Sequence, residues 1–171
     1  MKNYGWALCL AISLGALPLM AQDDAAAART AAGCGPSSEM FDVKTTDLKH
    51  PAGQPEAGKA LVYFFVDYVT APTMRVGVDG KWVGANDGKS YFFFQVEPGE
   101  HNVCTEWQSG TFKKSSERIG EAIHLSAEAG KTYYLRLNFS YQRMDLEFSD
   151  DAEGHFLMGS SLYATSQPKK K

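Results

Sequence analysis

Apolar and polar residues alternate most regularly between Thr73 and Trp107. Side chains on a strand point alternately to its two faces, so the alternation from Met74 to Asp79 predicts a half-buried strand. The dipeptide Asp79-Gly80 then favours a tight hairpin turn, because both central residues of such a turn need positive φ. Pro98-Gly99 is typical of a type II turn, where proline fixes φ at the first central position and glycine accepts the left-handed second. The predicted structural turns are therefore Asp79, Gly80, Pro98 and Gly99.

The same alternation recurs downstream and predicts strands at Glu121–Ala127, Thr132–Phe139 and Met144–Phe148. The stretch Ala60–Tyr68 differs, because it is apolar on both faces, which indicates a central strand covered on both sides. Ser109–Gly120 is polar and suits an exposed connection. Eight or so short strands separated by turn signals predict a single all-β sandwich.

The predicted organisation has four parts: a leader at 1–21, a flexible alanine-rich segment at 22–33, one β-sandwich domain at 34–165 with its core at 57–149, and a basic tail at 166–171. The alanine-rich segment is expected to be flexible because short isolated helices are marginal in water. Asp151–Tyr163 is ambiguous, since Asp150 and its neighbours could cap a short helix. Gly154 and Gly159 weaken that helix.

Four sequence blocks carry a family resemblance: GKALVYFF at Gly58–Phe65, VGVDGKWVG at Val76–Gly84, PGEH at Pro98–His101 and AGKTYY at Ala129–Tyr134. Together they resemble a bacterial family known as domain of unknown function 2846. A weaker resemblance is to the PEGA module, a small immunoglobulin-like β-domain. The resemblance implies an immunoglobulin-like, antiparallel β-sandwich of about eight strands in the bacterial envelope, and it brings no catalytic residues.

The first 21 residues are typical of a secretory signal peptide, with Lys2 near the start, an apolar run at Trp6–Leu17 and a small residue at Ala21. We expect cleavage after Ala21 and export to the periplasm or the extracellular space of a bacterium. The apolar run is shorter than the ~20 residues of a membrane span. An uncleaved leader is the alternative, and it would be the one route to a membrane. A lipoprotein is disfavoured, because Cys9 lies inside the run and not directly after it.

The net charge of the chain restricts the classes of partner it can bind, and its cysteines predict whether a disulfide forms. The formal net charge is −3, and this mild acidity argues against a nucleic-acid partner, which would need a basic face. Cys9 leaves with the leader, so Cys34 and Cys104 remain in an oxidising compartment, where a lone pair is normally bonded. We therefore predict a Cys34–Cys104 disulfide; two buried free thiols are the alternative. Closing so long a loop is worth about 4 kcal/mol in the chain-entropy model.

No motif in the chain indicates catalysis, a metal or a cofactor. The four histidines lie at no metal-ligand spacing, and there is no G-x-S-x-G elbow, Walker loop or dinucleotide-binding glycine loop. Acidic residues between Asp145 and Glu153 could offer oxygen ligands to calcium, but they lack the spacing of a calcium loop. We therefore expect no enzyme activity, no cofactor and no metal site.

The aromatic residues offer the one candidate surface. Tyr91 and Phe93 lie opposite Phe92 and Phe94 on one strand, so one of these sets must leave the main core. Either the N-terminal segment or Asp151–Tyr163 covers that set, or the set is a platform for sugar rings or for another protein. The candidate binding surface comprises Trp82, Tyr91, Phe93, Tyr134 and Arg136.

The sequence thus predicts a non-catalytic module that binds an envelope protein or polysaccharide. The alternative is a carbohydrate- or peptidoglycan-binding module, for which a flat exposed aromatic strip would be the sign. A third possibility is a hydrolase whose site is assembled only in three dimensions, and its sign would be His, Asp and Ser gathered in one cleft.

Overall fold

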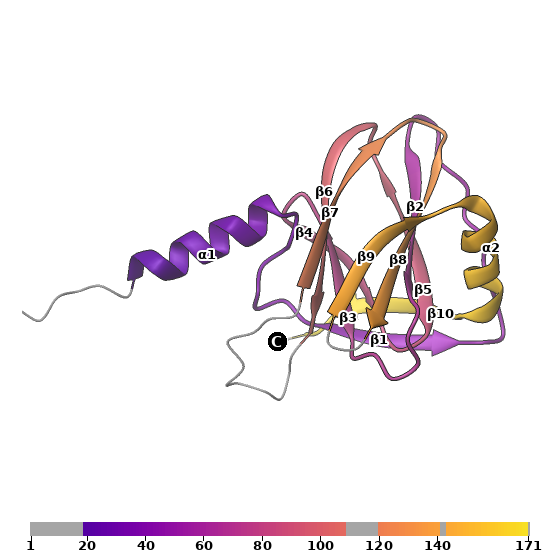
Figure 1. Cartoon of the computed structure of the whole chain (residues 1–171), viewed down its shortest axis with the longest axis horizontal. Helices are drawn as coiled ribbons and strands as arrows, with labels where there is room; N and C mark the ends of the chain where they lie inside the picture. The colour runs from indigo at the N-terminus through magenta and orange to yellow at the C-terminus, as the bar shows by residue number, and fades with distance from the viewer. Residues whose placement is uncertain (1–18, 109–119, 141–142, 171) are drawn as a thin grey trace, which may run out of the picture.

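The computed structural model describes residues 19–108, 120–140 and 143–170. In these ranges ten strands form two sheets, and two helices lie outside them (Figure 1). Most of the predicted leader and most of the predicted connection Ser109–Gly120 fall outside the described residues. No helix in the described ranges combines the length and the apolar composition that crossing a bilayer requires.

The two sheets pack face to face, which confirms the predicted all-β sandwich. The first sheet has six strands, in the order β1 (Phe41–Thr46), β10 (Leu162–Pro168), β5 (Ser90–Val96), β2 (Ala60–Val66), β8 (Thr132–Ser140) and β9 (Arg143–Ser149). The second sheet has four strands, in the order β4 (Lys81–Asn86), β3 (Met74–Val78), β6 (Gly99–Trp107) and β7 (Gly120–Ala127).

The prediction of a purely antiparallel sandwich is wrong in two places. Strand β2 pairs with β8 in parallel, and β10 pairs with β5 in parallel. A parallel pair needs a long connection between its strands; the chain builds the whole four-stranded sheet between β2 and β8. The immunoglobulin-like or PEGA-like character of the sandwich stays a prediction.

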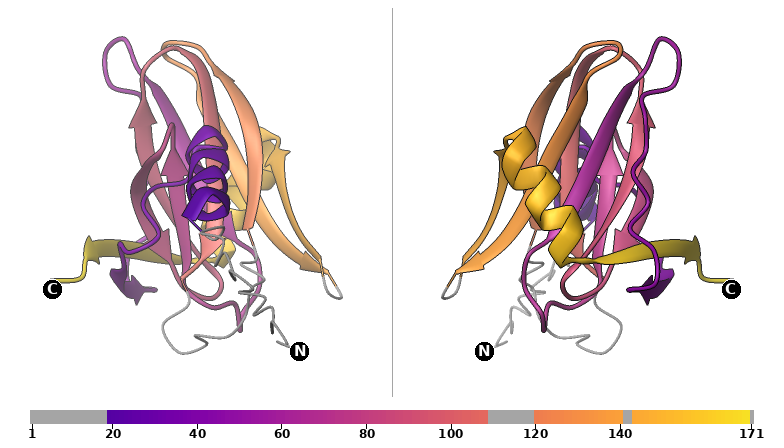
Figure 2. Two further views of the ribbon diagram at one scale, coloured as in Figure 1. Left: turned by 90° about the vertical axis from the view of Figure 1, so that its left-hand side faces the viewer. Right: turned by 90° about the vertical axis from the view of Figure 1, so that its right-hand side faces the viewer.

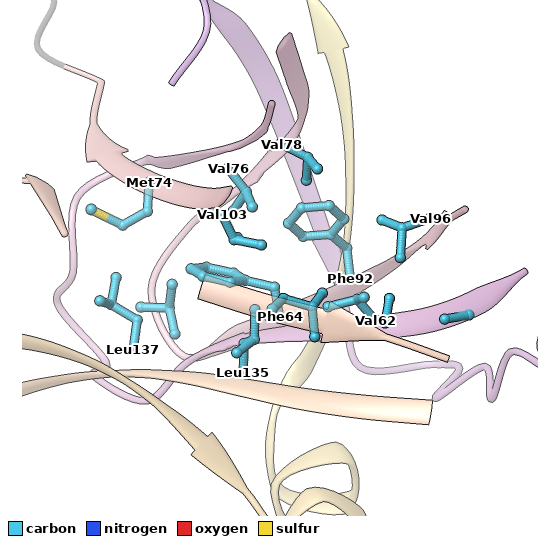
Figure 3. Close-up of a cluster of buried hydrophobic side chains, with 14 of the residues drawn as sticks. Val62, Phe64, Met74, Val76, Val78, Phe92, Val96, Val103, Leu135 and Leu137 are labelled. Atoms are coloured by element: carbon cyan, nitrogen blue, oxygen red, sulfur yellow. The ribbon is translucent and has the colours of Figure 1, made fainter. Parts of the chain in front are cut away.

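Strand β2 is the central strand that its composition predicted. All seven of its residues are buried, and β5 and β8 flank it. One face of β2 contributes Val62 and Phe64 to the core between the sheets, and the opposite face contributes Tyr63 and Phe65 to a second apolar cluster. The core between the sheets also holds the inward residues of the facing strands (Figure 3), among them Met74, Val76, Val103, Leu135 and Leu137.

The predicted hairpin turn forms at Asp79-Gly80, and the chain bends at Pro98-Gly99, where a type II turn was predicted. Asp79 has φ 50° and Gly80 has φ 85°, so both central residues of the β3–β4 hairpin adopt the positive φ that its turn requires. Gly99 has φ 136°, and the chain bends at Pro98-Gly99 between β5 and β6. Because glycine lacks a Cβ, it takes such values without strain.

We predicted that the alanine-rich segment is flexible, and this prediction is wrong. Most of the segment belongs to the helix α1 (Leu19–Ala31). Alanine has the highest helix propensity, and the helix ends in a well-formed cap. The Gly33 N–H donates to the Thr30 carbonyl (3.0 Å) and the Cys34 N–H to the Arg29 carbonyl (2.9 Å), with Gly33 at φ 96°. This is the Schellman pattern, in which a left-handed glycine ends a helix.

The C-terminal segment adds a helix, α2 (Asp151–Ser160), and a strand that sequence patterning missed, β10. Asp150 caps α2 by accepting a hydrogen bond from the Glu153 N–H (2.8 Å). The tail predicted at 166–171 begins too early, because residues 166–168 belong to β10 and pair with β1. Lys169 then lies 3.4 Å from the Asp42 carboxylate.

Candidate functional site

The predicted aromatic platform is buried. Tyr91 and Tyr134 are only 0% and 6% exposed, and they pack with Tyr63 and Phe65 in the second cluster on the outer face of the six-stranded sheet. Helix α2 lies across this face and adds two buried side chains (Figure 2), Leu157 and Met158. The prediction of an exposed surface at Tyr91, Phe93 and Tyr134 is therefore wrong, and the alternative that Asp151–Tyr163 covers these rings is confirmed.

A loop before β2 covers the rest of this aromatic face. The Tyr91 hydroxyl donates to the Pro51 carbonyl (3.1 Å), and the Tyr63 hydroxyl accepts from the Gly53 N–H (2.6 Å). Phe93 is half-buried, and any Cβ on Gly53 would come within 2.8 Å of its ring. Burial raises the pKa of Tyr91 to about 12 and also raises the pKa of Tyr63. These tyrosines are thus interior residues whose polar ends are satisfied within the chain.

Arg136 is engaged in an internal ion-pair network. Its Nη2 lies 2.6 Å from Asp67 Oδ2, and its Nη1 lies 2.7 Å from Glu153 Oε1. Partial burial would lower the pKa of Arg136, but the bonds and charges of these carboxylates outweigh burial and raise it. Because Glu153 belongs to α2, Arg136 fastens this helix to β8 and is not a free hydrogen-bonding partner for a ligand.

Trp82 lies on the other sheet, away from the tyrosines. Its indole N–H donates to the Pro36 carbonyl (2.8 Å), and the Arg75 guanidinium lies 4.4 Å from its ring centroid. Arg75 also donates to the carbonyls of Ser37 and Glu39. Together these groups hold residues 33–39, here called the strap, across the outer face of the four-stranded sheet. Hence the five predicted surface residues form no common surface.

The Cys34–Cys104 disulfide is present and fastens the strap to β6, with 5.0 Å between the Cα atoms. The strap runs very close to the sheet: a Cβ on Gly77 would lie 2.6 Å from the Gly33 carbonyl oxygen. Beside the disulfide, Glu106 forms ion pairs with Arg75 (3.2 Å) and with Arg29 of α1. Because Glu106 and Arg75 are almost fully buried, each needs its partner to avoid an uncompensated charge.

An open hollow of about 330 Å³ lies beside the disulfide, between the end of α1 and β7. We call it the staple hollow. Most of its lining side chains are small, and both cysteines border it; the lining residues are Ala28, Arg29, Ala32, Cys34, Cys104, Glu106, Gly120, Glu121 and Ala122.

A second hollow, of about 340 Å³, lies at the end of the sandwich where β3 begins and β6 ends. It is lined by apolar and aromatic groups, from Thr70, Pro72, Met74, Trp107, Phe139 and Met144. The ring of Tyr68 lies 5.4 Å from that of the lining residue Phe139, and Val69 stands in the chain between Tyr68 and the lining residue Thr70. Tyr68 is 47% exposed and Val69 is 74% exposed. We call the hollow with these two residues the apolar end.

Two of the four histidines, His101 and His124, lie on strands of the four-stranded sheet, whereas His50 contacts the Met158 carbonyl and His155 belongs to α2. His101 Nδ1 lies 2.6 Å from Asp79 Oδ2 and its Nε2 lies 2.7 Å from the Glu97 carbonyl, so both ring nitrogens face acceptors. Only the doubly protonated ring satisfies both contacts. Burial would lower the pKa of His101, but the bonds to Asp79 and Glu97 outweigh it and raise the pKa. His101 thus ties the two turns together.

The described residues bring together no recognisable catalytic group. In the described part of the chain, no three potential ligands among His, Cys, Asp and Glu converge on a metal position. Ser126 donates to Glu100 (2.8 Å), and His124 contacts the same carboxylate (2.5 Å), so the serine is not paired with the histidine. These three side chains lie on an exposed strand face and not in a cleft.

Comparison with known proteins bears on this architecture. The model of a family described as protein of unknown function (DUF2846) matches residues 56–149, which is more than half of the chain. The chain belongs to this family. A protein of Haemophilus influenzae described as uncharacterized is 23% identical over 99 residues, covering 57% of this chain and 54% of that protein. The match therefore spans about half the length of that relative, and no solved structure matches the chain.

The DUF2846 region contains strands β2 to β9, and therefore both hollows in large part and the aromatic face. The segments that cover the outer faces lie outside this region: the strap and the end of α1 on the four-stranded sheet, and α2 with the loop at Pro51–Gly53 on the aromatic face. Strands β1 and β10, which extend the six-stranded sheet, also lie outside it. In this chain the family core is thus closed by its own flanking segments. Of the two disulfide cysteines, Cys104 lies inside the region and Cys34 outside.

Sequence patterning missed the apolar end for a definable reason. The prediction extended the central strand to Tyr68, whereas β2 ends at Val66 and the chain turns outward. A Tyr-Val pair that follows a fully buried strand and precedes Pro72 was the available signal, because proline disfavours continuation of a central strand. The hollow itself depends on residues from four separate segments, which local patterning cannot bring together.

Proposed function

We propose that this chain is an exported, non-catalytic module that binds another protein of the bacterial envelope through its apolar end. The observation that carries the proposal is the open hollow lined by Trp107, Phe139 and two methionines, together with the exposed side chains of Tyr68 and Val69, which directly precede the lining residue Thr70. Exposed apolar surface of this kind is typical of interaction sites. The leader and the disulfide support an extracytoplasmic location.

The lining favours an apolar anchor side chain, such as Leu, Ile, Met or Phe, as the group that is bound. Aromatic residues and methionine are enriched at protein interfaces, where a central anchor commonly fills a desolvated pocket. Methionine side chains also adapt their shape to an incoming group. Met74 and Met144 lie on facing sheets, so the hollow could adjust from both sides.

The competing functions have less support in the structure. A sugar-binding strip would need flat exposed aromatic rings, and the rings predicted for that role lie beneath α2 and the loop at Pro51–Gly53. A hydrolase would need a nucleophile and a base converging in a cleft. Among the described residues, the side chains that line the two hollows include no serine or histidine.

The test compares three forms of the chain, purified from the extracytoplasmic fraction and immobilised for capture from envelope extract. Val69→Asp places a charge at the rim of the hollow. Phe156→Asp is the matched control, because Phe156 is 72% exposed on α2 and away from the apolar end. Captured proteins are quantified by mass spectrometry, and each candidate is then purified and titrated against the three forms.

We expect at least one purified partner to bind the unmodified chain and Phe156→Asp alike, and to bind Val69→Asp about tenfold or more weakly. Thermal midpoints should stay close together, because both positions are exposed. Equal affinity for Val69→Asp and the unmodified chain would contradict the proposal. An equal loss of affinity in both variants would also contradict it, because the effect would then come from the added charge and not from its position at the apolar end.

A further inference from the structure

Both cysteines of the disulfide line the staple hollow, and little of either is exposed: Cys34 is 6% exposed and Cys104 is 2% exposed. Cys104 pairs across the β6–β7 ladder with Ala122, whose side chain is a single methyl group on the same outer face. On the other side, Ala28 and Ala32 come from the end of α1. These small side chains leave open space on one side of the cysteines, whereas Gly33 of the strap packs closely against Cys104 and Gly77 of β3 packs closely against Cys34.

The strap is held on the four-stranded sheet by one covalent bond, the disulfide, and by several noncovalent bonds. The noncovalent part comprises the bonds from Arg75 and Trp82 to strap carbonyls and the Gly80 N–H bond to the Gly33 carbonyl (3.1 Å). Helix α1 should move together with the strap, because the Schellman cap at the end of the helix leads directly into Cys34. Figure 1 shows α1 extending away from the sandwich, so only its last turn lies near the sheets. Opening the disulfide would therefore loosen α1 and the strap before the sandwich.

We propose that the Cys34–Cys104 disulfide undergoes thiol–disulfide exchange in the folded protein, reached by a dithiol reductant through the staple hollow, and that it acts as a reversible latch on the strap and α1. A thiolate of the reductant attacks one sulfur and forms a mixed disulfide, while the other cysteine leaves as a thiolate and takes up a proton. The second thiol of the reductant then displaces the first cysteine. The chain gains two electrons and two protons, and the reductant becomes a disulfide.

The first test measures reduction under native conditions with dithiothreitol as the probe, followed by alkylation and mass spectrometry. Ala122→Phe fills the hollow from the sheet and Ala28→Phe fills it from α1, so one variant serves if the other fails to fold. Ala57→Phe is the control, at an exposed loop position outside the hollow. We expect the rate to rise in proportion to dithiothreitol, to fall about tenfold or more in a filled variant, and to stay unchanged in the control.

Two results would contradict the proposal that the reductant reaches the disulfide through the staple hollow. One is a rate that is independent of dithiothreitol and equal to the rate of global unfolding. The other is unslowed reduction in both filled variants.

The second test concerns the latch. After reduction, amide hydrogen exchange in residues 24–39 should speed up about tenfold or more, while β2 keeps its protection. Cys34→Ser with Cys104→Ser should reproduce that pattern without reductant. Unchanged exchange at 24–39 in both samples would show that the noncovalent bonds alone hold the strap, and that the disulfide is no latch.

Discussion

The two glycines of α2 lie in different surroundings, although both lower its helix propensity. A Cβ on Gly154 would overlap the ring of Tyr134, whereas a Cβ on Gly159 would meet no atom within 4 Å. Gly154 is therefore the point where the helix approaches the aromatic face most closely. Sequence patterning counted both residues against a helix, because propensity does not register a close contact with another element.

Substitution by alanine should separate these two positions. Gly154→Ala should lower the free energy of unfolding by about 1–3 kcal/mol, because the added methyl group forces the helix away from Tyr134. Gly159→Ala should raise it by about 0.5–1 kcal/mol, because alanine loses less backbone entropy in a helix. Urea denaturation measures both. The same sign for the two substitutions would contradict the packing of α2 described above.

His101 should make stability depend on pH. Its pKa is raised in the folded chain, so its stabilisation is fully present below the ordinary value of about 6.5 and is lost as pH rises through the raised pKa. Burial would raise the pKa of Asp79, but its bonds to His101 and to the Asn102 N–H outweigh burial and lower it. The Asp79 contribution is therefore present above about pH 4 and is lost as pH falls through the lowered value.

The test compares thermal midpoints of the unmodified chain and His101→Gln at pH 5.5 and pH 8.5. At pH 5.5 the thermal midpoint of the unmodified chain should be higher than that of His101→Gln. At pH 8.5 the difference between the two midpoints should be smaller. His124→Gln, at an exposed neighbour on the same sheet, is the control. An advantage of His101 that grows with pH would show that the ring is bound in its neutral form.

At the scale of elements, local patterning predicted most strands of the two sheets well, but it predicted the flanking helices and the C-terminal strand poorly. The face alternation of β3, β6, β7 and β8 is as predicted, because period-two burial is a local property. Helix α1 was missed although Gly33 signalled its C-terminal cap, and β10 was missed because its residues have no strong alternation. Patterning established that one of the two aromatic sets on β5 leaves the main core, but which set leaves and which segment covers it depend on tertiary packing.

Helix α2 should contribute to stability through one buried side chain and not through its exposed neighbour. Leu157→Ala should cost about 2–4 kcal/mol, because Leu157 packs into the aromatic cluster and is almost fully buried. Phe156→Ala should change the free energy of unfolding by less than about 0.5 kcal/mol, since Phe156 is exposed. Equal costs in urea denaturation would mean that α2 sits in another orientation.

At the scale of the whole molecule, the chain is a two-sheet family core closed by its own flanking segments. The strap crosses the outer face of the four-stranded sheet, and α1 approaches that sheet only at its last turn. On the other side, α2 covers the aromatic face, and β1 and β10 extend the six-stranded sheet (Figure 2). The predicted fold class and disulfide follow from strand periodicity and cysteine count. The candidate site does not, because the apolar end joins side chains from separate parts of the chain, and the predicted platform is buried by contacts of long sequence separation.

The central claim is that the open apolar surface lies at the end of the sandwich and not on the tyrosine face. Hydroxyl-radical footprinting of the folded, oxidised chain with mass spectrometry measures this directly, residue by residue. The account predicts strong oxidation at Tyr68 and Phe156 and protection of Tyr63, Tyr91 and Tyr134. Oxidation of Tyr91 and Tyr134 as fast as that of Tyr68 would contradict it and restore the tyrosine face as the candidate site.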